Sequence, residues 1–154
     1  MTQYPSGMRV NSLLAGKNFS VHQENIIVGN GAAELIKSLM GCLDGKIGIV
    51  RPTFEEYPNR YETDKEVVFT PGNDDLSYTA DDLIAYFGER EIANLLVINP
   101  DNPTGNYIPK ADLLRLTEWA KDKQIRLVID ESFVDFAETE VSNSLLEQEL
   151  IDSH

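Results

Sequence analysis

The sequence predicts an α/β fold in which a mostly parallel sheet is covered by helices on both faces. Two observations lead to this prediction. Short apolar runs typical of strands alternate along the chain with segments whose apolar residues recur at helical spacing. The strand-like runs are also apolar at nearly every position, as in strands buried on both faces, whereas a half-exposed strand alternates apolar and polar residues.

Five short runs rich in Val, Ile and Leu are predicted strands. Each is followed closely by Gly, Pro, Asn or Asp, which favour a turn or a loop. The predicted strands are residues 26–28, 47–50, 66–70, 95–98 and 126–129.

Four segments between these runs are predicted to be helical. Residues 32–43 carry apolar side chains at helical spacing, and residues 53–61 read as a helix broken or bent at Pro58. A third helix begins after Thr79, whose hydroxyl can cap its first turn. A fourth opens at Pro109, because proline is favoured in the first helical turn.

Composition excludes several classes of function. The length of 154 residues suits a single domain, residues 1–154, and 42% hydrophobic residues suffice for a buried core. A net charge of −13 repels nucleic acid and anionic membrane surfaces, so neither is an expected partner. The single cysteine, Cys42, excludes an internal disulfide and a multi-cysteine metal site, and no metal site is predicted.

The chain is expected to be soluble and cytoplasmic. It has no apolar run of the roughly 18 residues that a membrane span needs. Its N-terminus lacks the basic-then-apolar pattern of a secretory signal.

Three unusual loops follow predicted strands directly, at residues 29–33, 99–105 and 130–133. Ligands of parallel α/β sheets gather at the carboxyl ends of the strands, so these loops are the candidate site. Small residues at 29–33 let backbone N–H groups approach an anion, although a plain tight turn has the same pattern. Two prolines can fix the direction of the Asn102 amide, either for a ligand oxygen or only as part of a rigid turn.

Two further side chains carry similar alternatives. Asp130 follows an apolar strand, and a buried carboxylate needs a partner. That partner is a cationic ligand nitrogen, a neighbouring basic residue, or the backbone of the following segment, which the carboxylate would cap. The ring of Phe54 follows another strand and can stack on a planar heterocycle or belong to the core. A non-catalytic α/β module that binds a phosphate ligand therefore stays open at this point. A Ser-His-Asp hydrolase does not fit, because the chain has only His22 and His154 and lacks a G-x-S-x-G elbow.

Four segments together resemble the fold type I pyridoxal phosphate-dependent aminotransferases of class I/II. The resemblance is strongest to the branch that contains histidinol-phosphate aminotransferase and threonine-phosphate decarboxylase, and it extends from about Tyr4 to Phe136. It implies part of the large cofactor-binding domain of an enzyme that transfers an amino group between an amino acid and a 2-oxo acid. Decarboxylation of an amino-acid phosphate stays open. The four segments are GNGAAELI (29–36), RPTFEEY (51–57), NPDNPTG (99–105) and VIDESFVDF (128–136).

The resemblance implies three contacts to the cofactor ring. Asp130 matches the aspartate that pairs with the pyridinium nitrogen, and a carboxylate there favours the protonated nitrogen, which makes the ring a better electron sink. Asn102 matches the asparagine that hydrogen-bonds the phenolic oxygen. Phe54 occupies the position of the aromatic ring that stacks on the pyridine.

The resemblance also implies how the cofactor phosphate is held. Gly31, Ala32 and Ala33 match the glycine-containing turn whose backbone N–H groups bind it. Tyr4 resembles a tyrosine that reaches the phosphate of a neighbouring subunit. A homodimer is the expected assembly.

The chain departs from the family pattern in two ways. Phe133 stands where many members have a tyrosine whose hydroxyl tunes the phenolate. Residues 131–154 contain no lysine, although the family bonds its cofactor to a lysine in a Ser-x-Ser-Lys-like segment, and the C-terminal domain of the family is absent. The chain is therefore expected to be a piece of a longer enzyme and catalytically inactive by itself. The amino donor and acceptor are not predicted.

Overall fold

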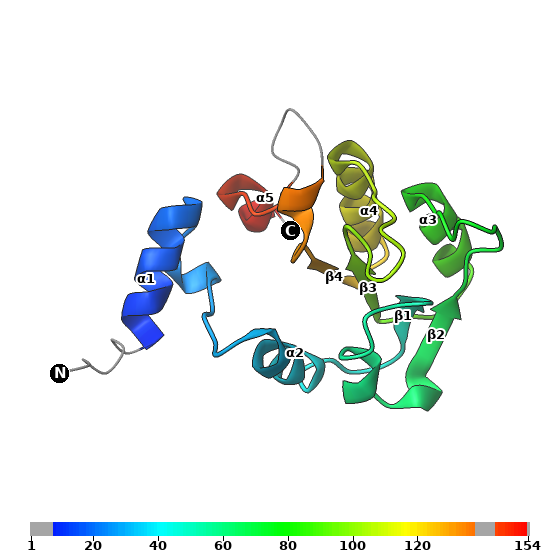
Figure 1. Cartoon of the computed structure of the whole chain (residues 1–154), viewed down its shortest axis with the longest axis horizontal. Coiled ribbons are helices and arrows are strands. Elements are labelled where there is room, and N and C mark those ends of the chain that lie inside the picture. Colours follow the sequence, from blue (N-terminus) through cyan, green and yellow to red (C-terminus); the bar gives the residue numbers. More distant parts are fainter. Residues whose placement is uncertain (1–7, 138–143, 154) are drawn as a thin grey trace. The chain divides into compact units, whose positions relative to one another are not determined.

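The structure is a computed structural model that describes residues 8–137 and 144–153 (Figure 1). The chain divides into two compact units. One comprises the described residues up to Leu35 together with those from Leu145 onward, and the other is Ile36–Ser144.

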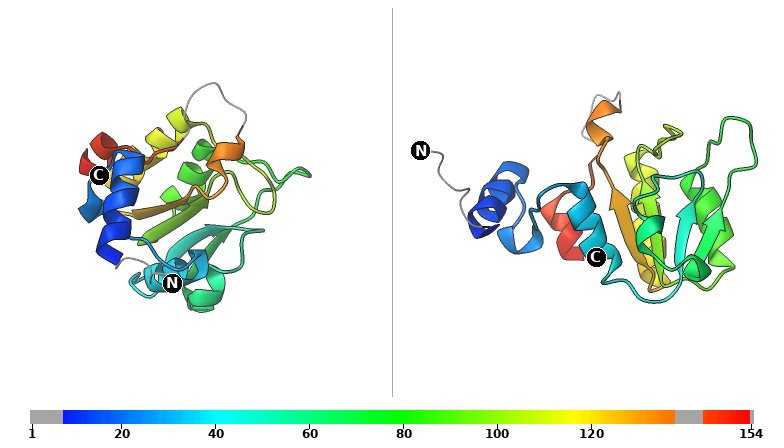
Figure 2. Two further views of the ribbon diagram at one scale, coloured as in Figure 1. Left: turned by 60° about the vertical axis from the view of Figure 1, so that its left-hand side comes forward. Right: turned by 60° about the horizontal axis from the view of Figure 1, so that its bottom comes forward.

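The larger unit is built on a parallel four-stranded sheet, which confirms the predicted fold class. Its strands lie side by side in the order β2-β1-β3-β4, and all three neighbouring pairs are parallel (Figure 2). The predicted strands at 47–50, 66–70, 95–98 and 126–129 are confirmed to within one residue at each end. The strands are β1 (Ile47–Val50), β2 (Glu66–Phe69), β3 (Asn94–Ile98) and β4 (Arg126–Asp130).

The central strands β1 and β3 are buried at every position, so both sheet faces are covered. On one face Ile49 and Leu96 belong to a core cluster with Met40 of helix α2 (Ala32–Met40). On the other face Gly48 leaves room for the ring of Phe87 of helix α3 (Ala80–Gly88), because a Cβ at Gly48 would lie 2.7 Å from Phe87 Cε1. Successive strand residues point to opposite faces, which explains why the runs are continuously apolar.

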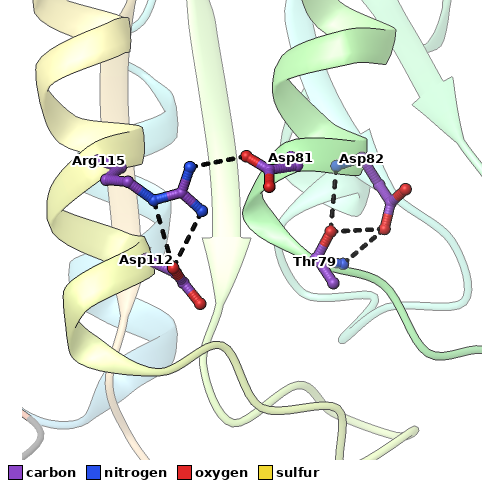
Figure 3. Close-up of polar contacts among 5 residues, drawn as sticks. All are labelled: Thr79, Asp81, Asp82, Asp112 and Arg115. Atoms are coloured by element: carbon purple, nitrogen blue, oxygen red, sulfur yellow. Dashed lines mark hydrogen bonds and ion pairs between the residues drawn. The ribbon is translucent and has the colours of Figure 1, made fainter.

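Helix α3 begins with the predicted cap at Thr79. Thr79 Oγ1 accepts a hydrogen bond from the Asp82 N–H at 3.2 Å, and Asp82 Oδ2 accepts one from the Thr79 N–H at 2.8 Å (Figure 3). This reciprocal pair is a capping box.

Arg115 of helix α4 (Lys110–Asp122) forms an ion pair with Asp81 of α3 at 2.8 Å and another with Asp112 of its own helix at 3.0 Å (Figure 3). The pair with Asp81 joins the two helices side by side.

Two predicted elements are wrong. Residues 26–28 form no ladder with any strand in the described part of the chain, and Ile27 is 80% exposed. Their β-branched composition favours extended backbone, but a strand also needs a neighbour to hydrogen-bond it. Residues 53–61 form only a turn and the 3-10 helix η2 (Pro58–Arg60), because Pro58 lacks the N–H that a continuing α-helix requires.

The helical segments differ from the predictions mainly at their ends. Helix α2 ends at Met40, three residues early, and α4 begins at Lys110 with Pro109 as its N-cap. Three short 3-10 helices were not predicted. They are η1 (Gln23–Asn25), η3 (Thr63–Lys65) and η4 (Val134–Phe136).

The smaller unit contains two helices that the sequence reasoning missed, α1 (Met8–Phe19) and α5 (Gln148–Ser153). Helix α1 has no strong apolar stripe, and the Leu13 and Leu14 side chains are exposed. The His22 N–H donates to Gln148 Oε1 at 2.7 Å, which joins these distant parts of the sequence. No helix in the described part of the chain is both long and apolar enough to cross a membrane.

Candidate functional site

Two of the three predicted site loops, 99–105 and 130–133, lie at the carboxyl ends of β3 and β4, and the segment that carries Phe54 follows the carboxyl end of β1. All four strands are parallel, so these ends meet at one edge of the sheet. The third loop, 29–33, follows no strand, because residues 26–28 form none. Ile98 pairs with Asp130 in the β3–β4 register. The Asn99 N–H then donates to the Asp130 carbonyl oxygen at 2.8 Å. The loops that carry Asn102 and Asp130 therefore start from adjacent, hydrogen-bonded positions.

The Asp130 carboxylate is held at both oxygens. Tyr57 Oη donates to Oδ2 at 2.7 Å, and the Ser132 N–H donates to Oδ1 at 2.8 Å. Asp130 forms no ion pair with a basic side chain of the described residues, so the ion-pair alternative is not realised there. The bond from the Ser132 N–H is the other structural alternative, a cap of the segment that follows β4. Each carboxylate oxygen can accept a further hydrogen bond, so capacity for a cationic nitrogen remains.

Tyr57 is the residue that sequence reasoning missed at this site. It is only 5% exposed, and its hydroxyl reaches a carboxylate 73 positions away in the sequence. Burial, and then the hydrogen bond and negative charge of Asp130, raise the pKa of the Tyr57 phenol, which keeps it a hydrogen-bond donor. The aromatic spacing of Phe54 and Tyr57 was the available signal, but nothing local indicated the partner.

Phe54 lies on the same loop and is exposed to solvent. Its ring meets Tyr57 edge-on, with centroids 6.3 Å apart and an interplanar angle of 77°, and Phe54 is 40% exposed. A ring held by its neighbour and exposed at 40% leaves area on which a planar heterocycle can stack.

The loop at 99–105 is fixed from within. The side chain of Asn99 donates to the Ile108 carbonyl at 3.0 Å and accepts from the Ile108 N–H at 2.7 Å, both buried. Thr104 Oγ1 donates to the buried Asp101 carboxylate, and the Gly105 N–H donates to the Asp101 carbonyl at 2.9 Å. Burial raises the pKa of Asp101, and the hydrogen bonds from Thr104 and the Asn102 backbone oppose that shift.

Asn102 differs from Asn99 in its side-chain contacts. Its amide is half-buried and makes no hydrogen bond to the residues that the structure describes. An amide in a loop fixed on both sides, with its donors and acceptor unused, is free to bind an oxygen of a ligand.

The remaining predicted residues are placed as follows. Gly31, at φ +108°, adopts a left-handed backbone that favours glycine, and Ala32 and Ala33 form the first turn of α2. All three belong to the smaller unit, whereas Phe54, Asn102 and Asp130 belong to the larger one. Tyr4 lies outside the described residues. The described residues contain no cluster of three or more His, Cys, Asp or Glu side chains that could hold a metal ion.

Comparison with known families decides the assignment. Residues 9–150 match the model of the family described as aminotransferase class I and II. This chain belongs to the class I and II aminotransferase family. Membership confirms the resemblance seen in the sequence and implies pyridoxal phosphate as the cofactor.

Curated relatives in this family have more than one activity. The chain is 34% identical over 140 residues to an L-serine phosphate decarboxylase of Sulfurospirillum multivorans, which covers 89% of this chain and 36% of the relative. It is 31% identical over 146 residues to a histidinol-phosphate aminotransferase of Ruminiclostridium cellulolyticum, covering 87% and 38%. The chain thus spans well under half the length of these aminotransferase-family relatives.

Solved structures agree on the fold. A decarboxylase from Sulfurospirillum multivorans superposes with a TM-score of 0.82 at 29% identity, covering 99% of this chain and 39% of that one. A histidinol-phosphate aminotransferase from Clostridium acetobutylicum gives a TM-score of 0.70 at 23% identity, covering 94% and 43%.

The sheet-edge residues fit a pyridine cofactor in their donor and acceptor chemistry. Asp130 offers an oriented anion, Asn102 an unused amide, and Phe54 an exposed aromatic ring. These are complementary to a protonated ring nitrogen, a ring oxygen and an aromatic plane.

Proposed function

We propose that this chain supplies the non-covalent cofactor contacts of a pyridoxal phosphate enzyme that transfers an amino group between an amino acid and a 2-oxo acid. The observation that carries the proposal is the Asp130 carboxylate at the end of β4. It is fixed by Tyr57 and Ser132 and has no basic partner among the described residues. A half-buried carboxylate so placed is suited to a ligand cation.

In this proposal each candidate residue has one task. Asp130 holds the proton of the ring nitrogen, Asn102 donates to the phenolic oxygen, and Phe54 covers one ring face. The backbone N–H groups at residues 31–33 bind the phosphate, with the partial positive charge of the α2 N-terminus behind them. When bound, the protonated ring draws electrons from the bond that breaks at the amino-bearing carbon of the substrate.

Several tasks are assigned to residues outside these 154. We infer that the lysine that bonds the cofactor, and the arginine that binds the substrate carboxylate, belong to other parts of a longer enzyme. Residues 1–154 are then part of a single cofactor-binding large domain. In this proposal the longer enzyme is a cytoplasmic homodimer, and Tyr4 reaches the phosphate of the partner subunit.

The second candidate function is decarboxylation of an amino-acid phosphate. It is favoured by two relatives named L-serine phosphate decarboxylase, 34% and 28% identical to this chain. The same Asp130 and Asn102 contacts serve either reaction, because both draw electrons from a bond to the amino-bearing carbon into the ring. The choice depends on which of those bonds is aligned for cleavage.

Turnover by the longer protein distinguishes the two. The longer protein with pyridoxal phosphate bound is incubated in one reaction with amino acids and a 2-oxo acid, and in another with phosphorylated amino acids alone. The keto product and the released CO₂ are measured in both reactions. Keto product without CO₂ supports amino transfer, and CO₂ release from a phosphorylated amino acid supports the second candidate. The 154-residue chain assayed in parallel is expected to show neither, and clear turnover by it would contradict the assignment of the lysine to other residues.

A further inference from the structure

Tyr57 carries a buried hydroxyl to the candidate site. The ring belongs to the same core cluster as Ile49 and Leu96 on one face of the sheet, and only 5% of the residue is exposed. Its Oη donates to Asp130 Oδ2 at 2.7 Å. Burying a phenol without a partner is costly, so this bond fixes where the hydroxyl lies.

The ring and the backbone of Tyr57 both contact Phe54. The two rings meet edge-on at 6.3 Å, and the Tyr57 N–H donates to the Phe54 carbonyl at 3.4 Å. Because Tyr57 is anchored in the core, one side chain restrains both the aromatic ring and the carboxylate assigned to the cofactor.

The hydroxyl has a specific effect on the carboxylate. Ser132 holds Oδ1 through its backbone N–H, and Tyr57 holds Oδ2. With both oxygens fixed, the carboxylate plane cannot rotate, and each oxygen presents its remaining lone pair in one direction. Without the hydroxyl only Oδ1 would be held.

We propose that Tyr57 is a positioning residue of the cofactor site. Its hydroxyl fixes the direction in which Asp130 meets the ring nitrogen, and its edge-to-face ring contact fixes the plane of Phe54. This inference rests on the proposed function. It assigns Tyr57 no contact with the cofactor itself.

The test uses the 154-residue chain and pyridoxamine phosphate, which carries the same ring but forms no bond to lysine. Tyr57→Phe keeps the ring and removes the hydroxyl. Tyr61→Phe is the matched control, because Tyr61 is a partly buried tyrosine packed against the same cluster whose hydroxyl donates to the Gly45 carbonyl at 2.7 Å. Asp130→Asn removes the carboxylate charge. Calorimetry gives the dissociation constant, and isotope-labelled ligand gives the nitrogen NMR shift, which reports whether the ring nitrogen is protonated.

The wild-type chain is expected to bind the ligand with a protonated ring nitrogen. Tyr57→Phe should weaken binding roughly tenfold and move the nitrogen shift toward the neutral form, because a mobile carboxylate holds the proton less well. Tyr61→Phe should leave the dissociation constant within about twofold of wild type and the nitrogen shift unchanged. It should lower the free energy of unfolding about as much as Tyr57→Phe does, since each variant loses one hydrogen bond. A purely structural role would move only the unfolding energy.

The outcomes separate the two claims. If Asp130→Asn impairs binding but Tyr57→Phe matches Tyr61→Phe in affinity and nitrogen shift, the positioning role is wrong and the proposed function stands. If the wild-type chain does not bind, or Asp130→Asn binds as wild type does, the proposed function fails and the positioning role fails with it. A Tyr57→Phe chain that does not fold, judged by urea unfolding, also contradicts the proposal, because the expected loss is that of a single hydrogen bond.

Discussion

The main-chain N–H of Asn99 donates a hydrogen bond of 2.8 Å to the carbonyl oxygen of Asp130. It continues the β3–β4 pairing by one step beyond the last residue of β3. The two loops that carry Asn102 and Asp130 thus leave the sheet from one shared point. Their separation depends on a rigid ladder rather than on two independent loops.

Asn99→Ala should destabilise the larger unit, whereas Asn102→Ala should not. The Asn99 side chain satisfies both backbone groups of Ile108 in a buried setting, and its loss leaves them unpaired, at a cost of about 3 kcal/mol. Asn102 makes no side-chain hydrogen bond among the described residues, so its replacement should cost less than about 0.5 kcal/mol. Urea unfolding measures both, and equal losses in the two variants would contradict the different roles assigned to them.

Gly48→Ala should destabilise the chain by about 1–3 kcal/mol, because the new methyl group would meet the Phe87 ring inside the core. Gly72→Ala is the control, since a Cβ there contacts nothing within 4 Å and the backbone is not left-handed. Thermal or urea unfolding compares the two. A neutral Gly48→Ala would show that α3 does not pack on the sheet as described.

At the start of α3 the cap should matter more than the ion pair beside it (Figure 3). Thr79→Ala removes a capping box and should cost about 1 kcal/mol. Asp81→Asn breaks an exposed ion pair to Arg115 and should cost under about 0.5 kcal/mol, with the loss disappearing at high salt. Urea unfolding at low and high salt tests this order, which would be wrong if Asp81→Asn were the more damaging change.

Asp101 should give stability a specific pH dependence. Its pKa is raised in the folded chain above the ordinary 3.8, chiefly by burial, so the folded state binds the proton more tightly than the unfolded state. Its contribution to stability is therefore fully present below 3.8 and is lost as the pH rises through the raised pKa. The stability of wild type relative to Asp101→Asn should increase as the pH is lowered from about 7 toward 3.8. A difference in unfolding free energy between wild type and Asp101→Asn that stays constant with pH would contradict this prediction.

The sheet could be predicted from the sequence because its strands are continuous apolar runs. Residues 47–50 could be recognised as a strand without knowledge of the neighbouring strands, because a strand buried at every position is a continuous apolar run. Residues 26–28 have the same local character, yet pairing is a property of two segments and none of the described strands pairs with them. Helix α1 was missed for the opposite reason, because it forms without a strong apolar stripe.

The candidate site was predictable only in part. Asp130 ends one strand, and Asn102 and Phe54 lie in the segments that follow two others, so the parallel arrangement brought them to one edge of the sheet. The hydrogen bond between Tyr57 and Asp130 joins residues 73 positions apart, and no local pattern encodes it. The two hydrogen bonds between the Asn99 side chain and the Ile108 backbone could not be predicted from a local pattern either.

The most direct test of the central claim, that Asp130 is the carboxylate that holds the cofactor ring, is the dissociation constant of pyridoxamine phosphate for Asp130→Asn. The control is Asp135→Asn, which makes the same chemical change at an exposed carboxylate five positions along the chain. We expect Asp130→Asn to weaken binding at least roughly tenfold, because the amide cannot act as the anionic partner of the ring nitrogen, while Asp135→Asn binds as wild type does. Equal affinity of wild type and Asp130→Asn would contradict the assignment of this site.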